Sequence, residues 1–224
     1  MLSRKDKLFK CIVEEYLKTA EPVGSLKLAA GLKISSATVR NEMMELEEKG
    51  LIFQPYTSAG RIPTEKGYEV YIKKFVIEKE DAVLEKKLKQ TASKSAEEEK
   101  VKVLAKAIAE IADEAVVVAF GEYHLFYTGL SNLFGKPEFS ARAMVMSVSE
   151  VLDHCERVMP KVMEKIFQDQ RILLGINNPF DKNCSFVGIS LPGYANGLFG
   201  ILGPLRMDYQ KNLNLVNSIK KILE

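Results

Sequence analysis

The stretch that decides the fold of the amino-terminal part is residues 35–50, which read SSATVRNEMMELEEKG. Ser35 or Ser36 is expected to begin a helix, because a serine oxygen at the N-cap accepts a backbone N–H that the helix leaves unpaired. Gly50 is typical of a helix end. Apolar residues three and four positions apart predict one buried face. These residues are Val39, Met43 and Leu46.

The opposite face of this helix carries small, amide and guanidinium side chains in its first two turns. With Val39 inward and about 100° per residue, Ala37 and Asn41 point outward. Thr38 and Arg40 lie on the flanks. Asparagine pairs with adenine edges, arginine with guanine or phosphate, and small apolar groups with the thymine methyl. The helix is therefore predicted to read the major groove of DNA; the alternative is an ordinary solvated face.

The residues around this helix extend the pattern to a whole domain. Before it, two helices are predicted, the first capped by Ser3 and the second by Ser25, with a break at residues 21–24. After it, residues 51–54 and 61–63 are short strand signals around a turn, and Thr64 caps a fourth helix. Three helices, a hairpin and a helix within residues 1–76 are the order of a winged helix-turn-helix domain.

The turn of the hairpin is a second candidate DNA contact. Residues 56–61 are small or hydroxylic apart from Tyr56 and Arg61, so the backbone approaches a sugar-phosphate wall and Arg61 reaches a minor groove. The alternative is a polar hairpin without a partner. The predicted DNA-binding residues are Ser36, Ala37, Thr38, Arg40, Asn41, Thr57, Ser58 and Arg61.

Residues 77–114 are predicted to be linker helices. Residues 78–102 are rich in lysine and glutamate, and Ser95 with Glu98 forms a capping-box pattern that restarts a helix. An apolar stripe follows, with two interpretations: docking onto the next domain, or contact with a second copy of the chain. The stripe consists of Val101, Leu104, Ile108 and Ile111.

Residues 115–224 are predicted to form an α+β domain with an antiparallel sheet. Segments 115–120 and 123–128 read as a β-hairpin, and segments 171–176, 185–191 and 197–202 as further strands. One long amphipathic helix is expected over residues 145–167, with a disturbance at Pro160, and a final helix from about Met207.

The composition favours a soluble cytoplasmic protein without a catalytic centre. Lysine and arginine number 32 against 30 aspartates and glutamates, so no global field marks a polyanionic partner. Three scattered cysteines without CxxC spacing indicate a reducing compartment. Neither His124 nor His154 has a suitable metal or nucleophile neighbour in the sequence, and we expect no cofactor and no metal.

A resemblance rests on the strings IVEEY at 12–16, EPVGS at 21–25, ISSATVRNEM at 34–43, QPYTSAGRIPT at 54–64, YTGLSNL at 127–133, PEF at 137–139, NP at 178–179 and GILGPLRMDY at 200–209. These strings resemble the HrcA family of bacterial heat-inducible transcription repressors. The resemblance extends over about two-thirds of the chain, in the family's order.

The resemblance implies a repressor that binds an inverted-repeat operator before chaperone operons and is released on heat stress. It also implies a winged-helix domain, a GAF-like regulatory and dimerisation domain over residues 115–224, and assistance from the chaperonin GroEL. The stretch between the fourth helix and Tyr127 is shorter than the family's, so the chain resembles a shortened member.

Three further expectations follow. A homodimer is expected, because one recognition helix reads too few base pairs to discriminate among genomic sites. A regulator whose GAF-like domain senses a small molecule is the alternative function. A third possible function is an enzyme built on the carboxy-terminal domain. It is disfavoured because the sequence offers no catalytic grouping of cysteine, histidine and acidic residues.

Overall fold

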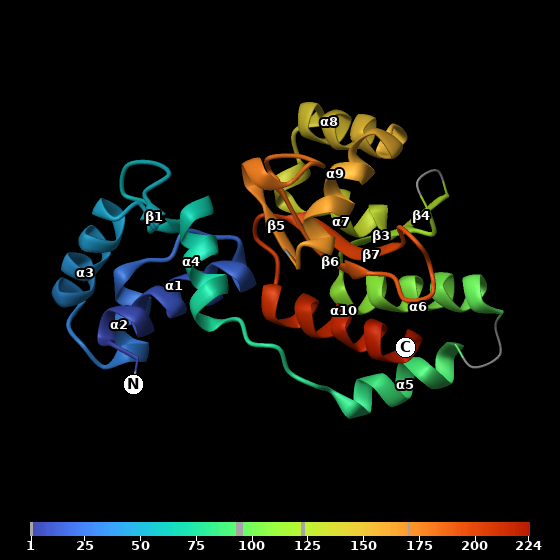
Figure 1. Ribbon diagram of the computed structural model, residues 1–224. Helices are drawn as coiled ribbons and strands as arrows, with labels where there is room; N and C mark the ends of the chain where they lie inside the picture. Colours follow the sequence, from blue (N-terminus) through green and yellow to red (C-terminus); the bar gives the residue numbers. More distant parts are fainter. Residues whose placement is uncertain (1, 93–95, 122–123, 170) are drawn as a thin grey trace. The chain divides into compact units, whose positions relative to one another are not determined.

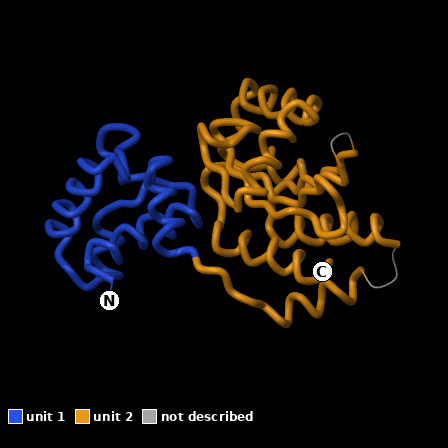
Figure 2. The backbone as a smooth tube through the Cα atoms, viewed as in Figure 1, with its two compact units in different colours: residues 1–76 blue, residues 77–224 orange. Residues whose placement is uncertain are grey.

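A computed structural model describes residues 2–92, 96–121, 124–169 and 171–224 (Figure 1). The chain divides into two compact units, residues 1–76 and residues 77–224 (Figure 2). Each unit has its own buried apolar residues. Within the described ranges, no helix is both long and apolar enough to span a bilayer.

The first unit has the predicted order of three helices, a hairpin and a helix. Serine and threonine caps begin three of the helices where the sequence predicts them: Ser3 in a capping box with Asp6, Ser35 and Thr64. The cap predicted at Ser25 is wrong, because this residue is already helical and Gly24 takes the N-cap position. The elements are α1 (Arg4–Thr19), α2 (Ser25–Leu32), α3 (Ser36–Glu48), β1 (Ile52–Phe53), β2 (Ile62–Pro63) and α4 (Glu65–Phe75).

The hairpin of the first unit is joined to the segment before α2. β1 and β2 pair antiparallel, and Val23 pairs with Arg61 through two backbone hydrogen bonds of 2.9 and 3.0 Å. A Cβ at Gly60 would lie 2.4 Å from the carbonyl carbon and oxygen of Val23, so only glycine permits this approach. Two of the strings that carry the family resemblance therefore meet here.

The second unit is an α+β fold with a five-stranded antiparallel sheet, as predicted. The strand order is β4-β3-β7-β6-β5. Its strands are β3 (Ala115–Ala119), β4 (Leu125–Thr128), β5 (Ile172–Leu174), β6 (Cys184–Ser190) and β7 (Leu198–Pro204). Its helices are α5 (Ala82–Ala92), α6 (Glu97–Ala112), α7 (Leu130–Phe134), α8 (Arg142–Asp153), α9 (Cys155–Phe167) and α10 (Tyr209–Leu223), with 3₁₀ turns Pro137–Phe139 and Gly175–Asn177.

Helices cover both faces of this sheet. α6 and α10 lie on one face and α7, α8 and α9 on the other (Figure 1). β3 reads AVVVA and is buried at every position, as expected of a central strand between two helical layers. Its alternate residues Ala115, Val117 and Ala119 join the core beneath α7 to α9.

The predicted single helix over residues 145–167 is wrong in its centre. The chain breaks at His154, whose φ of −119° and ψ of 35° end α8 and begin α9. Pro160 lies inside α9 instead of at the break. Leu152 of α8 and Met159 of α9, on either side of this break, lie in one buried cluster.

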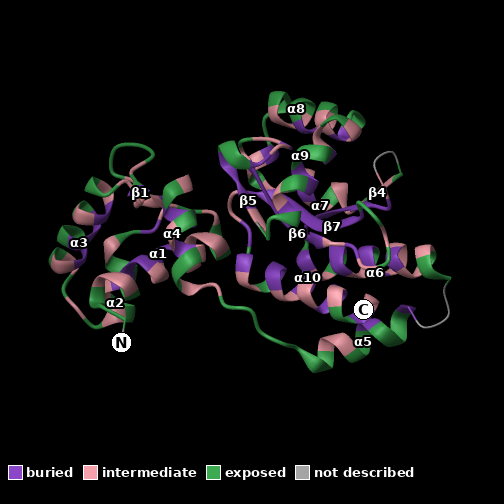
Figure 3. Cartoon of the chain, in the orientation of Figure 1, coloured by how far each residue is buried: buried purple, intermediate pink, exposed green. Residues whose placement is uncertain are grey.

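The segment predicted as linker helices belongs to the second unit. α6 packs against β3, β4, α5 and α10, and its stripe is buried there (Figure 3). The exposed fractions of Val101, Leu104 and Ile108 are 1%, 0% and 0%, and Ile111 is half-buried. The prediction that this stripe forms a dimer contact is therefore wrong, since the chain's own sheet and helices cover it. Ser95 lies outside the described residues, and α6 begins at Glu97.

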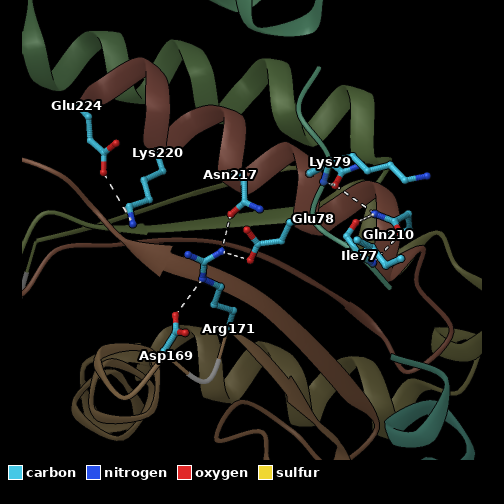
Figure 4. A network of polar contacts seen from close by, with 10 residues as sticks. Ile77, Glu78, Lys79, Asp169, Arg171, Gln210, Asn217, Lys220 and Glu224 are labelled. Carbon is cyan, nitrogen blue, oxygen red and sulfur yellow. Dashed lines mark hydrogen bonds and ion pairs between the residues drawn. The ribbon is translucent and has the colours of Figure 1, made fainter. Parts of the chain in front are cut away.

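An extended strap, residues 77–80, precedes α5 and is held by polar side chains of the second unit (Figure 4). Gln210 accepts from the N–H of Ile77 at 3.0 Å and donates to its carbonyl at 2.5 Å. Asn214 accepts from the N–H of Lys79 at 3.0 Å. Arg171 donates to Glu78 at 2.5 Å and to Asn217 at 2.9 Å, and Lys221 pairs with Glu80. The strap is therefore fixed at each residue to the body of this unit.

Candidate nucleic-acid interface

The outward face of α3 is open along its first two turns. Ala37, Arg40 and Asn41 are exposed, whereas Val39 and Met43 are buried. Among the residues that the structure describes, the Asn41 amide has no hydrogen-bond partner. The helix thus presents a free amide beside a guanidinium, in the arrangement that its sequence predicts.

Hydroxyl groups at the N-cap and in the first turn order this face. The Ser35 oxygen accepts from the backbone N–H of Thr38 at 3.0 Å and lies 2.8 Å from the Thr38 hydroxyl. Arg40 donates from Nε to the Ser36 carbonyl and from Nη2 to the Ser36 hydroxyl, both at 3.3 Å. Ser36 and Thr38 are half-buried, so they hold neighbouring groups as well as lying beside the exposed residues.

The hairpin loop projects small and hydroxylic residues. Tyr56, Thr57 and Ser58 are exposed, and the Ala59 N–H donates to the Tyr56 carbonyl at 3.0 Å to close a turn. Ser58 has a φ of 66°, in the left-handed region that this tight turn requires. The loop residues predicted to contact DNA are therefore at the surface.

Arg61 does not extend into solvent as the sequence suggests. Its side chain is 19% exposed, and its Nε donates to Glu47 Oε2 at 2.9 Å. Its Nη1 lies 3.5 Å from the Ala59 carbonyl. The guanidinium is thus occupied by contacts within the unit, whereas the sequence predicts that Arg61 reaches a minor groove.

The acids of α3 are largely neutralised by bases from other elements. Arg4 pairs with the buried Glu42 at 2.5 Å, Lys5 pairs with Glu45, and Arg61 pairs with Glu47. Residues 1–76 contain 13 lysines and arginines against 10 aspartates and glutamates. A polyanion approaching the amino-terminal half of α3 therefore meets little unpaired negative charge from these acids.

A groove of about 530 Å³ runs between the start of α2, α3 and the hairpin loop. Leu26 and Met44 in its lining are 76% and 55% exposed, which places apolar groups beside the Arg40 side chain. Its remaining lining comes from Val23, Gly24, Ser25, Met43, Gln54, Ser58, Ala59, Gly60 and Arg61. The groove brings together elements from all the predicted contact regions.

The histidines and cysteines of the second unit do not form a reactive cluster. His154 is exposed while the adjacent Cys155 is buried, and burial raises the pKa of that thiol to about 12. Burial raises the pKa of Cys184 as well. Among the described residues, no three His, Cys, Asp or Glu side chains are grouped so as to hold a metal ion.

Comparisons with known proteins show the protein family of this chain. The family model described as "HrcA protein C terminal domain" matches residues 22–213. The chain belongs to the HrcA family. A heat-inducible transcription repressor HrcA of Natranaerobius thermophilus is 41% identical over 122 residues, 51% of this chain and 35% of the relative. The repressor of the same name from Alkaliphilus metalliredigens is 54% identical over 71 residues, 31% and 21% of the two chains.

These alignments span about a third or less of the length of the curated relatives. One solved structure, titled "Crystal structure of a hypothetical protein at 2.2 A resolution", covers 99% of both chains with a TM-score of 0.71 and 17% identity. That likeness concerns the fold alone.

Proposed function

We propose that this chain is a DNA-binding transcriptional repressor of heat-shock operons. In this proposal residues 1–76 are a winged helix-turn-helix domain, α3 is the recognition helix and the loop at residues 55–60 is the wing. The observation that carries it is the exposed face of α3, where Asn41 and Arg40 stand beside Ala37. Those groups have the chemistry that reads base edges in a major groove.

The second unit is proposed to be a GAF-like regulatory and dimerisation domain. Two recognition helices related by a two-fold axis would read the two halves of an inverted-repeat operator. The stripe on α6 is covered by the chain itself, so another face must supply the dimer contact. Family membership supports the remaining parts of the proposal. These are release on heat stress, assistance from GroEL, a cytoplasmic location and the lack of enzymatic activity.

Selection from a random duplex library tests the DNA-binding function without assuming an operator. The purified chain is expected to enrich an inverted repeat, and the same repeat is expected in a footprint on the chaperone promoters of its own genome. Failure to enrich any sequence over bulk DNA would overturn the proposal.

Asn41→Ala then tests the recognition helix. We expect a loss of about 1–3 kcal/mol on the enriched duplex and little change on random duplex, because one base contact is removed. Asn177→Ala, which truncates an exposed asparagine of the second unit, is the matched control. Equal losses on both duplexes would show that Asn41 touches phosphate only.

A further inference from the structure

Glu47 joins the last turn of α3 to both strands of the hairpin. Its Oε1 accepts from the backbone N–H of Gln54, just after β1, at 3.2 Å. Its Oε2 accepts from Arg61, just before β2, at 2.9 Å. One carboxylate therefore fixes the two ends of the loop to the helix.

The two residues held by Glu47 also hold the inside of the loop. Gln54 donates from Nε2 to the Ala59 carbonyl at 3.1 Å, and Arg61 Nη1 lies 3.5 Å from the same oxygen. Glu47, Gln54, Ala59 and Arg61 thus form a closed set of contacts, which we name the hairpin clasp. The clasp is half-buried, so its ion pair is less screened than one in open solvent.

The burial of Arg61 indicates a structural role. With 19% of its side chain exposed, reaching a phosphate would require breaking its bond to Glu47. An acid beside a phosphate-binding arginine would also oppose a polyanion. The Glu47–Arg61 ion pair thus lowers the electrostatic attraction of this surface for DNA. Its presence is explained if it holds the loop in place.

We propose that Glu47 is a positioning residue for DNA recognition, which fixes the wing loop against α3 so that one duplex meets both as a preformed surface. Arg61 acts through the same clasp and does not contact phosphate. This inference rests on the proposed DNA-binding function. Preforming the surface removes the entropic cost of ordering the loop at each binding event.

The direction in which Glu47→Ala changes DNA affinity distinguishes two roles of Arg61: holding the clasp together and contacting a phosphate. Removal of a negative charge should tighten binding to DNA if charge alone matters, and it would free Arg61 for phosphate. If the clasp positions the loop, the variant instead binds the enriched duplex about tenfold more weakly, because the loop must be ordered on binding. Glu48→Ala, which removes an exposed acid at the next position, is the control and is expected to bind as well as the wild type or better.

Salt dependence and a double variant complete the test. Arg61→Ala should weaken binding without changing the slope of log affinity against log salt, whereas loss of a phosphate contact would make the slope shallower by about one unit. The double variant should cost no more than the worse single variant, because both remove one clasp. Glu47→Gln, which keeps one oxygen acceptor, should recover part of the affinity.

Folding and loop order are followed in the same samples. Thermal melting confirms that each variant is folded, and hydrogen exchange at Ala59 should be faster when the clasp is broken. Wild-type affinity in Glu47→Ala, or a one-unit shallower slope in Arg61→Ala, overturns the inference while leaving the DNA-binding proposal intact. A wild-type chain that binds no duplex overturns both.

Discussion

α3 and α6 have the same kind of sequence pattern and opposite outcomes. Each carries an apolar stripe at steps of three and four, and each stripe is buried inside its own unit. In α3 the face opposite the stripe stays open and carries Asn41 and Arg40. In α6 the stripe itself was the predicted contact surface, and the sheet and α10 cover it. The spacing identifies the buried side of a helix but not the partner that buries it.

Ile108→Glu is the change that most strongly tests this contrast. Ile108 is 0% exposed on α6, so a charge there is expected to destabilise the second unit by more than about 4 kcal/mol. Urea unfolding measures the loss, with Lys106→Glu on the exposed side of the same helix as control. A variant with normal stability that has lost only self-association would restore α6 as a dimer surface.

Glu114 extends the contrast to a buried titratable group just beyond α6. Burial raises its pKa to about 8, against the opposing attraction of Lys136, and its Oε2 is buried without a hydrogen-bond partner in the described structure. The folded state therefore holds a proton that the unfolded chain releases near the ordinary carboxyl pKa of 4.5. Stability is full below that pH and falls as pH rises toward 8, by about 1.4 kcal/mol per pH unit.

Glu114→Gln should remove most of this pH dependence. We expect the variant to be more stable than the wild type at pH 8 and similar at pH 4.5, as followed by urea unfolding across that range. Glu110→Gln, on the exposed face of α6, should leave the wild-type profile unchanged. A wild-type stability that rises between pH 4.5 and 8 would contradict a buried, neutral Glu114.

Substitutions of Arg40 test whether the open face of α3 contacts bases or phosphates. Arg40→Ala is expected to cost about 1–3 kcal/mol of affinity for the enriched duplex, and Arg40→Lys to restore little of it if the guanidinium binds a base in bidentate fashion. Fluorescence anisotropy on specific and random duplexes distinguishes the roles. Full rescue by lysine, with equal losses on both duplexes, would assign Arg40 to phosphate.

The smallest loss of stability is expected for a substitution on α10, the helix that packs against α6. Gln210→Ala removes both backbone bonds to Ile77 but no apolar packing, so stability should fall by about 1 kcal/mol or less. The strap should become more accessible, and limited proteolysis should cut near residues 77–80 faster than in the wild type. Lys89→Ala, which truncates an exposed side chain on α5, is the control. Unchanged cleavage would show that other contacts suffice to hold the strap.

Local signals account for the parts of the fold that the sequence predicts. The caps at Ser3, Ser35 and Thr64 depend on residues within three positions, and the strands depend on runs of apolar residues. The open face of α3 follows from the same periodicity. These features need no knowledge of the rest of the chain.

Contacts between distant residues account for the parts that the sequence does not predict. Glu42 occupies a position of the buried face of α3, but its partner Arg4 is 38 residues away. Glu47 meets Arg61 across 14 residues, so the arginine reads as a free contact group until the hairpin is folded. The break at His154 likewise depends on a core assembled from several elements. Periodicity carries no signal for such pairings.

The strap described above determines how long a tether connects the two units. Residues 76–81 lie between α4 and α5, and six free residues would reach about 20 Å when extended. Because Ile77 is already held by Gln210, only Val76 remains as free tether while the strap is bound. One turn of B-DNA advances about 34 Å, so the difference in reach is about half a turn. Under the proposed function, a fastened strap would limit the half-site spacings that two copies of the chain can bind, and a released strap would widen that range.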